Sequence, residues 1–500
     1  MRKRYHSRCR PWAKVWETLP TSTSVRSPCR ARQFADGASG ARHGGARRFG
    51  SVAAASTGRR DQYGQYGDKG GYAVQRRLLG LAAAGLSSVL SLGALTGCGA
   101  GSPLSGDVTL HVVAADYGDP KTHNSSTAYW DALAQAFEKQ NPHINVDVRV
   151  IDWTHVDDTV ATMVKQGKAP DVAQIGSYAS YAAADQLYSA DDLFPVSEQA
   201  DFLPSLAAAG SVDRTQYGIP WVSSSRMFFY NKKLFSQAGI SKAPQTWAEL
   251  KADAVKLKAA GVRMPYGLPL GTEEAQAESL MWMLGADGGY TDTVGSYTFD
   301  SSANVQAFNW VKKNLVDAGL VGPTDPATTN RQDVFTAFLA GKAGMINGHP
   351  TLLAQAKQAG IDVGVVPLPG LAGPSPNTLG VADWMMAFKQ NGHLDADGKF
   401  LQYVFQEKNT RKFLDEYGLL PVTTSALTSM RKDPKDRDLV QFLNLLPEAV
   451  FYPVNKTSWG PVSDQVKKKI GQAVHGDPKA VLSDLQRFAI SADAQNAQKQ

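Results

Sequence analysis

The most constraining feature of this sequence is a regular alternation of strand-like and helix-like segments that starts at residue 107. Apolar and polar residues alternate over 107–115, which is typical of a strand that enters a core. Apolar positions three and four residues apart then predict a helix over 129–137. The same order continues with a strand at 144–150, a helix at 155–166 and a strand at 170–175. This alternation predicts a parallel α/β sheet with right-handed crossovers.

Two polar segments follow strands of this sheet, and we expect them to share one of its edges. The loop 116–124 follows the first strand, and the turn Gly176-Ser177-Tyr178 follows the third. Ligands of open α/β sheets collect at the carboxyl ends of the strands. Neither segment has the glycine pattern that cradles a phosphate, so a nucleotide site has little support.

The basic charge of the chain lies entirely in its first part. Five hundred residues predict two or three domains, and the formal net charge is +6. Residues 1–97 carry 17 Lys and Arg against 4 Asp and Glu, whereas the remaining residues carry 35 against 42. The basic excess is therefore no sign of nucleic-acid binding, and the chain contains no nucleic-acid motif.

Residues 1–73 form a leader that is rich in Arg, Ser, Gly and Ala and lacks sustained periodicity. Such a composition predicts disorder. Two interpretations stay open, namely a translocated or targeting extension and a start codon assigned too far upstream. The change of composition at Val74 favours the second, with translation that starts near this residue.

A secretory signal follows the leader. Arg76 and Arg77 form a short positive region, an apolar stretch runs from Leu78 to Leu95, and Leu-Thr-Gly-Cys98 ends it. This ending resembles the bacterial lipoprotein box, which implies that residues 74–98 are a lipoprotein signal peptide and that Cys98 is acylated. Residues 99–106 would then be a polar tether. The alternative is a transmembrane anchor, which the small Gly- and Ser-rich apolar region and the tether disfavour.

Cysteine usage agrees with this interpretation. The chain has three cysteines, Cys9, Cys29 and Cys98, so a mature chain that starts at Cys98 has no internal disulfide. An exported domain of about 400 residues buries enough surface to fold without one.

The stretch from Tyr217 to Leu250 contains a strand and two helices with clear boundaries. Met227–Tyr230 is a short apolar run, typical of a strand that is buried on both faces. Residues 232–238 predict a helix that Gly239 ends. Thr246 is followed three residues later by a glutamate, which predicts a capping box at the start of the second helix.

The motifs of this stretch, Gly-x-Pro-Trp, Tyr-Asn-Lys, Ala-Gly and Thr-Trp-x-Glu-Leu, occur in an order that resembles the bacterial extracellular solute-binding proteins of family 1. The maltose-binding-like members of this family deliver sugars to ABC importers. Later segments resemble further motifs of the family in the expected order: Trp282–Tyr290, Phe335–His349, Val363–Pro369, Leu379–Phe388 and Phe413–Pro421. The resemblance covers the chain from about Asp107 to the C-terminal region.

The resemblance implies an α/β, two-lobed periplasmic-binding-protein-like fold of type II. Each lobe would be a mostly parallel sheet flanked by helices. The first lobe would comprise residues 107–221 and 379–420, and the second residues 222–378 and 421–500. Three hinge crossings between the lobes are expected near 219–224, 376–381 and 418–423.

The resemblance also implies a function. The chain would be an extracellular substrate-binding lipoprotein of an ABC transporter, held at the outer face of the cell membrane by lipid on Cys98. It would capture a sugar or oligosaccharide between its lobes and deliver it to the transmembrane permease. We expect a monomer without cofactor, metal or nucleic-acid partner.

Sugar recognition needs aromatic faces against the C–H patches of the ring and planar polar groups for paired hydroxyls. Such side chains occur at predicted strand ends and crossings. The candidates for the ligand site are Tyr117, Asn124, Ser177, Tyr178, Trp221, Ser224, Glu278, Trp282, His349, Asp383, Trp384, Tyr452 and Trp459. For each aromatic residue the alternative is core packing, which we expect for Trp247.

Two candidates bear most on specificity. Trp459 resembles the late cleft tryptophan that maltose-type members stack on their sugar. Asp383 is a departure, because the family often has Gly-Gly-Trp where this chain has Ala382-Asp383-Trp384. An acid at this position narrows the cleft and adds a hydrogen-bond acceptor, so the sugar of a relative cannot simply be transferred to this chain.

The alternative function is a lipid-anchored extracellular carbohydrate-active enzyme of the glycosidase type. Such an enzyme needs two opposed carboxylates, for which Asp116 and Asp383 are the best pair. The chain has no Gly-x-Ser-x-Gly and no His-Glu-x-x-His motif, and its nine histidines lack ligand spacing. The segment 395–398 resembles the start of a calcium loop but lacks the later acidic ligand, so a turn at a helix start is the better interpretation. The sequence thus favours a binding protein over an enzyme.

Overall fold

The computed structural model describes residues 107–118 and 124–497. The described residues all belong to one compact unit, Gly99–Gln500. The leader, the signal peptide, the lipidation site Cys98 and the tether lie outside the described residues and stay predictions. Of the helices in the described part, none is both long enough and apolar enough to cross a membrane.

The first sheet is built from the segments that the alternating pattern predicts. Its strands are β1 (Val108–Ala115), β2 (Ile144–Ile151), β3 (Val172–Ile175), β6 (Ile219–Ser225), β11 (Thr378–Ala387) and β12 (Ala449–Val450). β1 lies between β2 and β3 and is parallel to both, which confirms the predicted parallel sheet. β11 joins β3 and β6 antiparallel and β12 parallel.

Helices flank this sheet, and most of them bury apolar side chains. They include α1 (Thr127–Glu138), α2 (Val156–Lys165), α3 (Ala179–Ala183), α4 (Ala190–Leu193), α5 (Val196–Gln199), α6 (Pro204–Ala209), α13 (Leu394–Val404) and α14 (Glu407–Tyr417). In α1, Trp130, Leu133 and Phe137 are buried at the spacing that one face of a helix requires. A hairpin of β4 (Ser211–Val212) and β5 (Thr215–Gln216) follows α6.

The second sheet has the order β10-β7-β9-β8. Its strands are β7 (Met227–Asn231), β8 (Met264–Tyr266), β9 (Ala343–Gly348) and β10 (Val363–Val366). Only β8 and β9 are parallel, whereas β7 is antiparallel to both β9 and β10. The expectation of a mostly parallel sheet is therefore wrong for this lobe. The reason is that β7, which continues from β6, inserts between two strands that run in the opposite direction.

The helices of the second lobe are α7 (Lys232–Gln237), α8 (Trp247–Ala259), α9 (Ala275–Leu284), α10 (Ser302–Val311), α11 (Arg331–Leu339), α12 (Pro350–Gln358), α17 (Trp459–Lys469) and α18 (Pro478–Ala497). The predicted capping box opens α8, with the Thr246 side chain accepting from the Glu249 N–H and the Glu249 carboxylate accepting from the Thr246 N–H. Trp247 is buried and donates to the Pro369 carbonyl at 2.9 Å, as expected for a structural residue.

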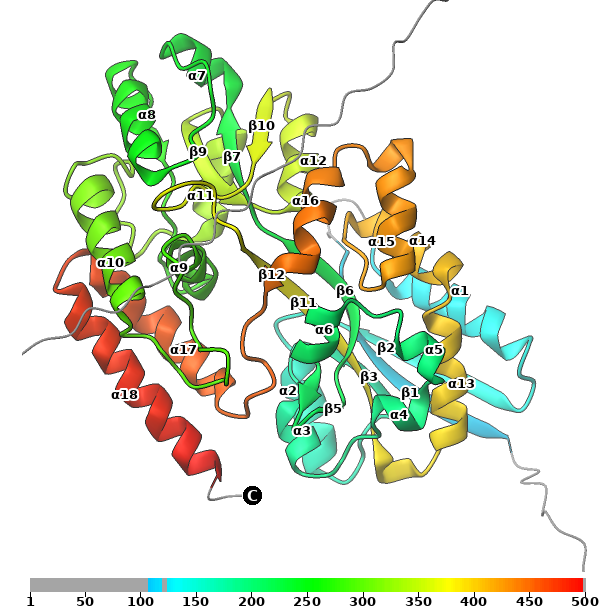
Figure 1. Cartoon of the computed structure of the whole chain (residues 1–500). Helices are drawn as coiled ribbons and strands as arrows, with labels where there is room; N and C mark the ends of the chain where they lie inside the picture. The colour runs from blue at the N-terminus through cyan, green and yellow to red at the C-terminus, as the bar shows by residue number, and fades with distance from the viewer. Residues whose placement is uncertain (1–106, 119–123, 498–500) are drawn as a thin grey trace, which may run out of the picture. The chain divides into compact units, whose positions relative to one another are not determined.

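The three segments that were expected to cross between the lobes are hydrogen-bonded neighbours. β6 and β11 pair antiparallel along most of their length, and both run between the two halves of the described unit in Figure 1. Ser223 and Leu420 exchange backbone hydrogen bonds of 2.9 and 2.8 Å. Short neighbouring segments of this kind can bend together, which is the arrangement that a hinge needs.

The segment after the third crossing contacts both lobes. It contains α15 (Thr424–Lys432) and α16 (Val440–Leu445). Asp436 accepts from Arg411 of α14 at 2.6 Å, and Asp438 pairs with Lys357 of α12. The boundary of the lobes within this segment stays a prediction.

Candidate functional site

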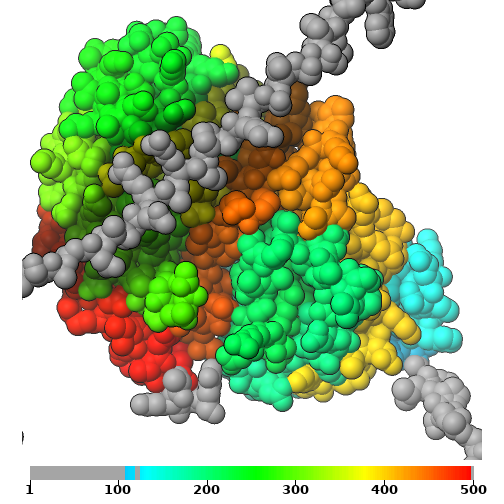
Figure 2. Space-filling view, viewed as in Figure 1, coloured from blue at the N-terminus to red at the C-terminus, as the bar shows by residue number. Residues whose placement is uncertain are grey.

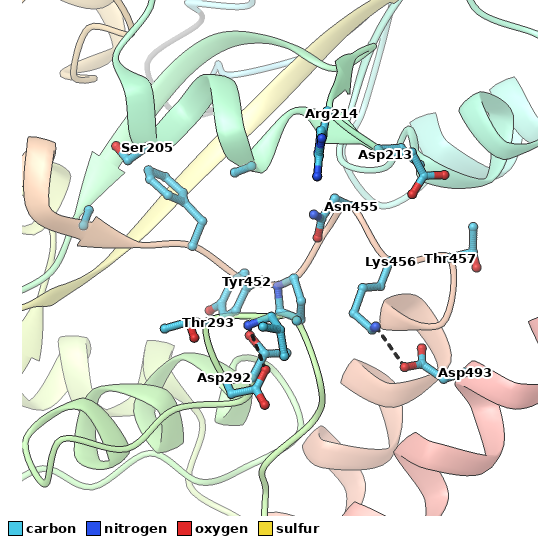
Figure 3. A pocket seen from close by; sticks show the side chains of 18 of the residues that line it. Ser205, Asp213, Arg214, Asp292, Thr293, Tyr452, Asn455, Lys456, Thr457 and Asp493 are labelled. Carbon is cyan, nitrogen blue, oxygen red and sulfur yellow. Dashed lines mark hydrogen bonds and ion pairs between the residues drawn. The ribbon is translucent and has the colours of Figure 1, made fainter.

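A cavity of about 1150 Å³ opens between elements of the two lobes. Its walls are α6 and the β4–β5 hairpin on one side and the turn 291–295 on the other, and its floor is the segment 449–457 (Figure 3). Figure 2 shows the hollow between the turn 291–295, in light green, and the teal surface over α6, with the orange floor between them. A cavity of this size accommodates a ligand of several sugar rings.

Two tight turns flank the cavity. Asp213 and Arg214 have φ angles of 49° and 69°, which a two-residue hairpin turn between β4 and β5 requires. In Figure 3 the Arg214 side chain extends from this turn toward the floor. Across the cavity, the Asp292 carboxylate accepts from the Val294 and Ser296 N–H groups at 3.0 and 2.8 Å and fixes the second turn.

An aromatic stack lies at the floor of the cavity. The rings of Tyr452 and Trp459 are nearly parallel, with centroids 5.4 Å apart and an angle of 22°. The Tyr290 ring lies 5.5 Å from Trp459. Trp459 is the first residue of α17, and only 8 % of its surface is exposed. Tyr452 is the member of this stack that lines the cavity.

On the first lobe, Tyr117 and Asp383 form one polar pair. The Tyr117 hydroxyl donates to Asp383 at 2.6 Å, and it accepts from the Gln174 amide at 3.1 Å. Burial raises the pKa of the Asp383 carboxyl to about 6; the Tyr117 hydrogen bond opposes this rise, and the charge of Asp157 adds to it. Sequence analysis expected the Asp383 carboxylate to face a ligand. One of its oxygens already accepts a hydrogen bond from Tyr117.

A β-bulge sets the direction of the side chains at this point. The register between β11 and β6 shifts between Asp383 and Trp384, so that β6 has Trp221 as an extra residue opposite them. Bulges re-aim side chains, and here Asp383 turns to Tyr117 while Trp384 is 1 % exposed. Trp221 packs into the first-lobe core, 5.6 Å from the Trp130 ring and 5.1 Å from the Phe413 ring.

The turn after β3 is held by a carboxylate and an aromatic pair. Asp157 accepts from the Gly176 N–H at 3.1 Å, next to Ser177. Tyr178 and Trp384 pack against each other with centroids 5.4 Å apart, and both are buried. The Tyr178 hydroxyl donates to the Ala209 carbonyl of α6, so this pair lies behind the cavity wall.

On the second lobe, Glu278 of α9 is the centre of a buried network. Its carboxylate accepts from the Tyr266 hydroxyl at 2.8 Å, the Trp282 indole at 2.9 Å and the Asn347 amide at 3.1 Å. Burial raises the pKa of Glu278 to about 7, against the effect of these hydrogen bonds. The Trp282 ring itself packs between Trp247 and Trp310 at 5.3 and 5.9 Å.

An arginine links the remaining candidates of the second lobe. Arg226 donates to the Ser224 hydroxyl at 3.0 Å and to Glu274 at 2.8 Å. Burial lowers the pKa of His349, and the positive charges of Arg226 and Arg331 lower it further. His349 is therefore neutral at physiological pH and contacts the ring of Phe335 at 5.2 Å.

The comparisons with known proteins agree with this geometry. Residues 121–411 match the family of bacterial extracellular solute-binding proteins. The chain belongs to that family. A binding protein of Brucella abortus is 31% identical over 386 residues, which is 73% of this chain and 89% of the relative. The sn-glycerol-3-phosphate-binding periplasmic protein UgpB of Escherichia coli is 23% identical over 326 residues, 60% of this chain and 73% of the relative.

Solved structures of binding proteins show the same two-lobed fold. The GacH receptor of Streptomyces glaucescens has a TM-score of 0.64 at 23% identity, and the match covers 77% of this chain and 99% of that one. The sugar-binding protein MalE of Xanthomonas citri has a TM-score of 0.65 at 22% identity, with 78% and 98% covered. Maltose-bound MalE3 of T. maritima has a TM-score of 0.63 at 20% identity, with 76% and 100% covered. The two-lobed type II fold that the sequence predicted is thus confirmed.

In this solute-binding protein, the structure brings the candidates together in small groups. These groups are Tyr117 with Asp383, Tyr178 with Trp384, Glu278 with Trp282, Ser224 with His349 through Arg226, and Trp459 with Tyr452. The Asn124 carbonyl accepts from the Tyr417 hydroxyl at 3.1 Å. Their roles in ligand binding stay predictions.

Sequence analysis missed several polar residues of the solute-binding protein's second lobe. Arg226 is 6 % exposed and pairs with Glu274, which in turn pairs with Arg331 at 2.6 Å. The only local signal was a single arginine between the serines of β6 and the apolar residues of β7. Glu274 and Arg331 lie about 50 and 100 residues later in the chain than Arg226, so no local pattern shows the pairing.

Asp116 and Asp383, the carboxylates that a glycosidase would use, both accept hydrogen bonds from other residues of the chain. Both oxygens of Asp116 accept hydrogen bonds, from the Gly118 and Ser126 N–H groups at 2.9 and 2.8 Å and from the Ser125 hydroxyl at 2.8 Å. These bonds hold the pKa of Asp116 below its usual value although burial opposes them. Asp116 thus organises its loop. Within residues 107–118 and 124–497, no group of three His, Cys, Asp or Glu side chains could hold a metal ion.

Proposed function

We propose that this solute-binding protein is the extracellular substrate-binding lipoprotein of an ABC importer and captures a sugar or oligosaccharide between its lobes. The observation that carries the proposal is the cavity of about 1150 Å³, which both lobes line and which has an aromatic stack at its floor. Aromatic faces at the floor and polar side chains on the walls are the combination that carbohydrate rings need.

The relatives indicate two classes of ligand. The GacH receptor was solved with acarbose and MalE3 with maltose, whereas UgpB is named for sn-glycerol 3-phosphate. A phosphate needs cations whose charge is available. Here Arg226 and Arg331 are both paired with Glu274, and Arg331 also with Glu273 at 2.7 Å. These two arginines do not line the cavity. Of the cations that do, Lys456 is paired with Asp493 at 2.9 Å, and Arg214 extends toward the floor. The preference for an uncharged sugar therefore rests on the aromatic floor.

Binding would close the hinge formed by the three crossings. A ligand that contacts both lobes binds the closed form better than the open form, and only this difference in affinity shifts the equilibrium. The closed form would then be the state that the transmembrane permease receives. Capture and release need no bond to be made or broken, so the proposed function requires no cofactor.

Lipid on Cys98 would keep the protein at the outer face of the cell membrane. The support for this part is the Leu-Thr-Gly-Cys98 sequence at the end of an apolar stretch. Two acyl chains are enough for stable anchoring, since each buried methylene contributes roughly 0.8 kcal/mol. We propose a monomer, because one chain contains both walls of the cavity.

A thermal-shift screen tests the proposal. The purified protein is melted with a panel of mono-, di- and trisaccharides and, separately, with sn-glycerol 3-phosphate. We expect at least one saccharide to raise the melting temperature, because a ligand that binds only the folded state stabilises it. The same mixtures are assayed for new reducing ends, and we expect none. Release of reducing ends would identify a glycosidase, and a shift with sn-glycerol 3-phosphate alone would replace the sugar by a phosphate ester.

A further inference from the structure

The floor of the cavity presents a different aromatic residue from the one that the sequence pattern emphasises. Trp459 resembles the sugar-stacking tryptophan of maltose-type relatives, but it does not line the cavity and is 8 % exposed. Tyr452 lies against it in a stacked arrangement, at 5.4 Å and 22°, and lines the cavity together with Phe451 and Pro453. The ring that a ligand meets at this point is therefore Tyr452.

Trp459 is held from two sides. Tyr452 stacks against it, and Tyr290 lies against it at 5.5 Å and 41°. Tyr290 is itself fixed, because its hydroxyl hydrogen-bonds Ser279 and the Gln276 carbonyl at 2.7 Å each. A ring that is fixed in this way is a firm backing for Tyr452, and stacked aromatic pairs of this spacing attract each other.

The hydroxyl group of Tyr452 lacks a partner. It is buried, and among the described residues no group hydrogen-bonds to it. Burial raises the pKa of Tyr452; the negative charge of Glu274 adds to this rise and the positive charge of Arg226 opposes it. A buried hydroxyl without a hydrogen bond is costly, and a ligand hydroxyl at this place would remove the cost.

We propose that Tyr452 is the platform on which a sugar ring of the ligand stacks, that its hydroxyl group hydrogen-bonds the ligand, and that Trp459 is a positioning residue behind it. The inference rests on the proposed sugar-binding function and assigns its specificity to a residue that the family motif does not mark. A sugar on the cavity side of Tyr452 lies between the turn at Arg214 and the turn at Asp292, which belong to different lobes (Figure 3).

The test compares variants of the purified full chain by isothermal titration calorimetry. The probe is the member of a maltose, maltotriose, cellobiose and trehalose panel that binds the wild type most tightly. Tyr452→Ala removes the platform and should weaken binding roughly tenfold or more. Tyr452→Phe keeps the ring and loses only the hydroxyl group, so its affinity should lie between those of the wild type and Tyr452→Ala. Tyr188→Ala is the matched control, because this tyrosine does not line the cavity.

A double-mutant cycle separates positioning from direct contact. Trp459→Ala should weaken binding in the wild type, but it should add little to the loss that Tyr452→Ala already causes, because Trp459 acts through Tyr452. Trp459→Phe should restore most of the affinity. Circular dichroism and the melting temperature show whether each variant is folded. If Tyr452→Ala is not folded, Tyr452→Phe still tests the hydroxyl group, because it retains the packing volume of the ring.

Each outcome has a distinct meaning. Full affinity in Tyr452→Ala with a loss in Trp459→Ala would overturn the inference and leave the sugar-binding function intact, with Trp459 as the platform. Additive losses in the double variant would overturn the positioning role, because both rings would then contact the sugar independently. Failure of the wild type to bind any member of the panel, together with no thermal shift in the wider saccharide screen, would overturn the proposed function itself.

Discussion

Replacing Asp397 with asparagine should change how the stability of the protein depends on pH. Asp397 lies in the first turn of α13 and is fully buried, and among the described residues neither of its carboxylate oxygens has a hydrogen-bond partner. The neighbouring Asp171 is equally buried, but its carboxylate accepts from the His111 N–H at 2.7 Å and from Asn391 and His393 at 3.0 and 2.9 Å. Asp171 thus has partners that stabilise its charge, and Asp397 has none.

Burial, together with the negative charge of Asp171, raises the pKa of Asp397 from 3.8 to about 8. Between these two values the folded state holds a proton that the unfolded state has lost. The free energy of unfolding therefore falls as pH rises, by about 1.4 kcal/mol per pH unit for one group. From pH 5 to pH 7 this loss amounts to roughly 2.7 kcal/mol, and it levels off above pH 8. The asparagine in Asp397→Asn does not titrate, so this variant should not show the loss of stability.

Urea unfolding at pH 5, 6, 7 and 8 measures the effect. We expect the difference in unfolding free energy between Asp397→Asn and the wild type to grow in favour of the variant as pH rises. Asp395→Asn is the control, because Asp395 is exposed on the same turn of α13 and should leave the pH dependence unchanged. If the unfolding free energies of the wild type and Asp397→Asn change by the same amount from pH 5 to pH 7, the buried carboxyl of Asp397 does not hold its proton in this range. The reasoning then fails.

Three further predictions concern other parts of the chain. Trp221→Ala should destabilise the protein by roughly 3–5 kcal/mol in urea unfolding, because it leaves a cavity among buried rings, and a loss below 1 kcal/mol would contradict its place in the core. Thr246→Ala should cost about 1 kcal/mol by removing the capping box of α8, whereas Thr246→Ser should restore it. Cys98→Ala should release the protein from the membrane fraction into the medium on immunoblots, and retention at the membrane would argue against lipid anchoring.

The sequence was sufficient for the elements whose signals are local. The period-two and period-3.6 patterns predicted β1, α1 and β2, and the threonine and glutamate of the capping box marked the start of α8. Strand direction in the second sheet was not predictable in this way. It depends on where β7 inserts, and that is decided by contacts with β9 and β10 more than 100 residues away.

The candidate site was predictable in kind but not in detail. The motifs identified the tryptophans near the crossings, yet aromatic residues suit a core and a sugar site equally well. Burial separates the two, because Trp221 is enclosed by Trp130 and Phe413 whereas Tyr452 lines the cavity. The Arg226–Glu274 pair joins residues 48 positions apart, and only the fold brings them together.

The most direct test of ligand capture between two lobes is small-angle X-ray scattering of the purified protein, with and without a saturating concentration of the sugar that gives the largest thermal shift. A ligand that bridges the lobes favours the closed form, so the radius of gyration should fall on binding and should not change with a sugar that gives no thermal shift. A radius of gyration that stays the same at saturation, with binding confirmed by calorimetry in the same sample, would contradict closure of the lobes around the ligand.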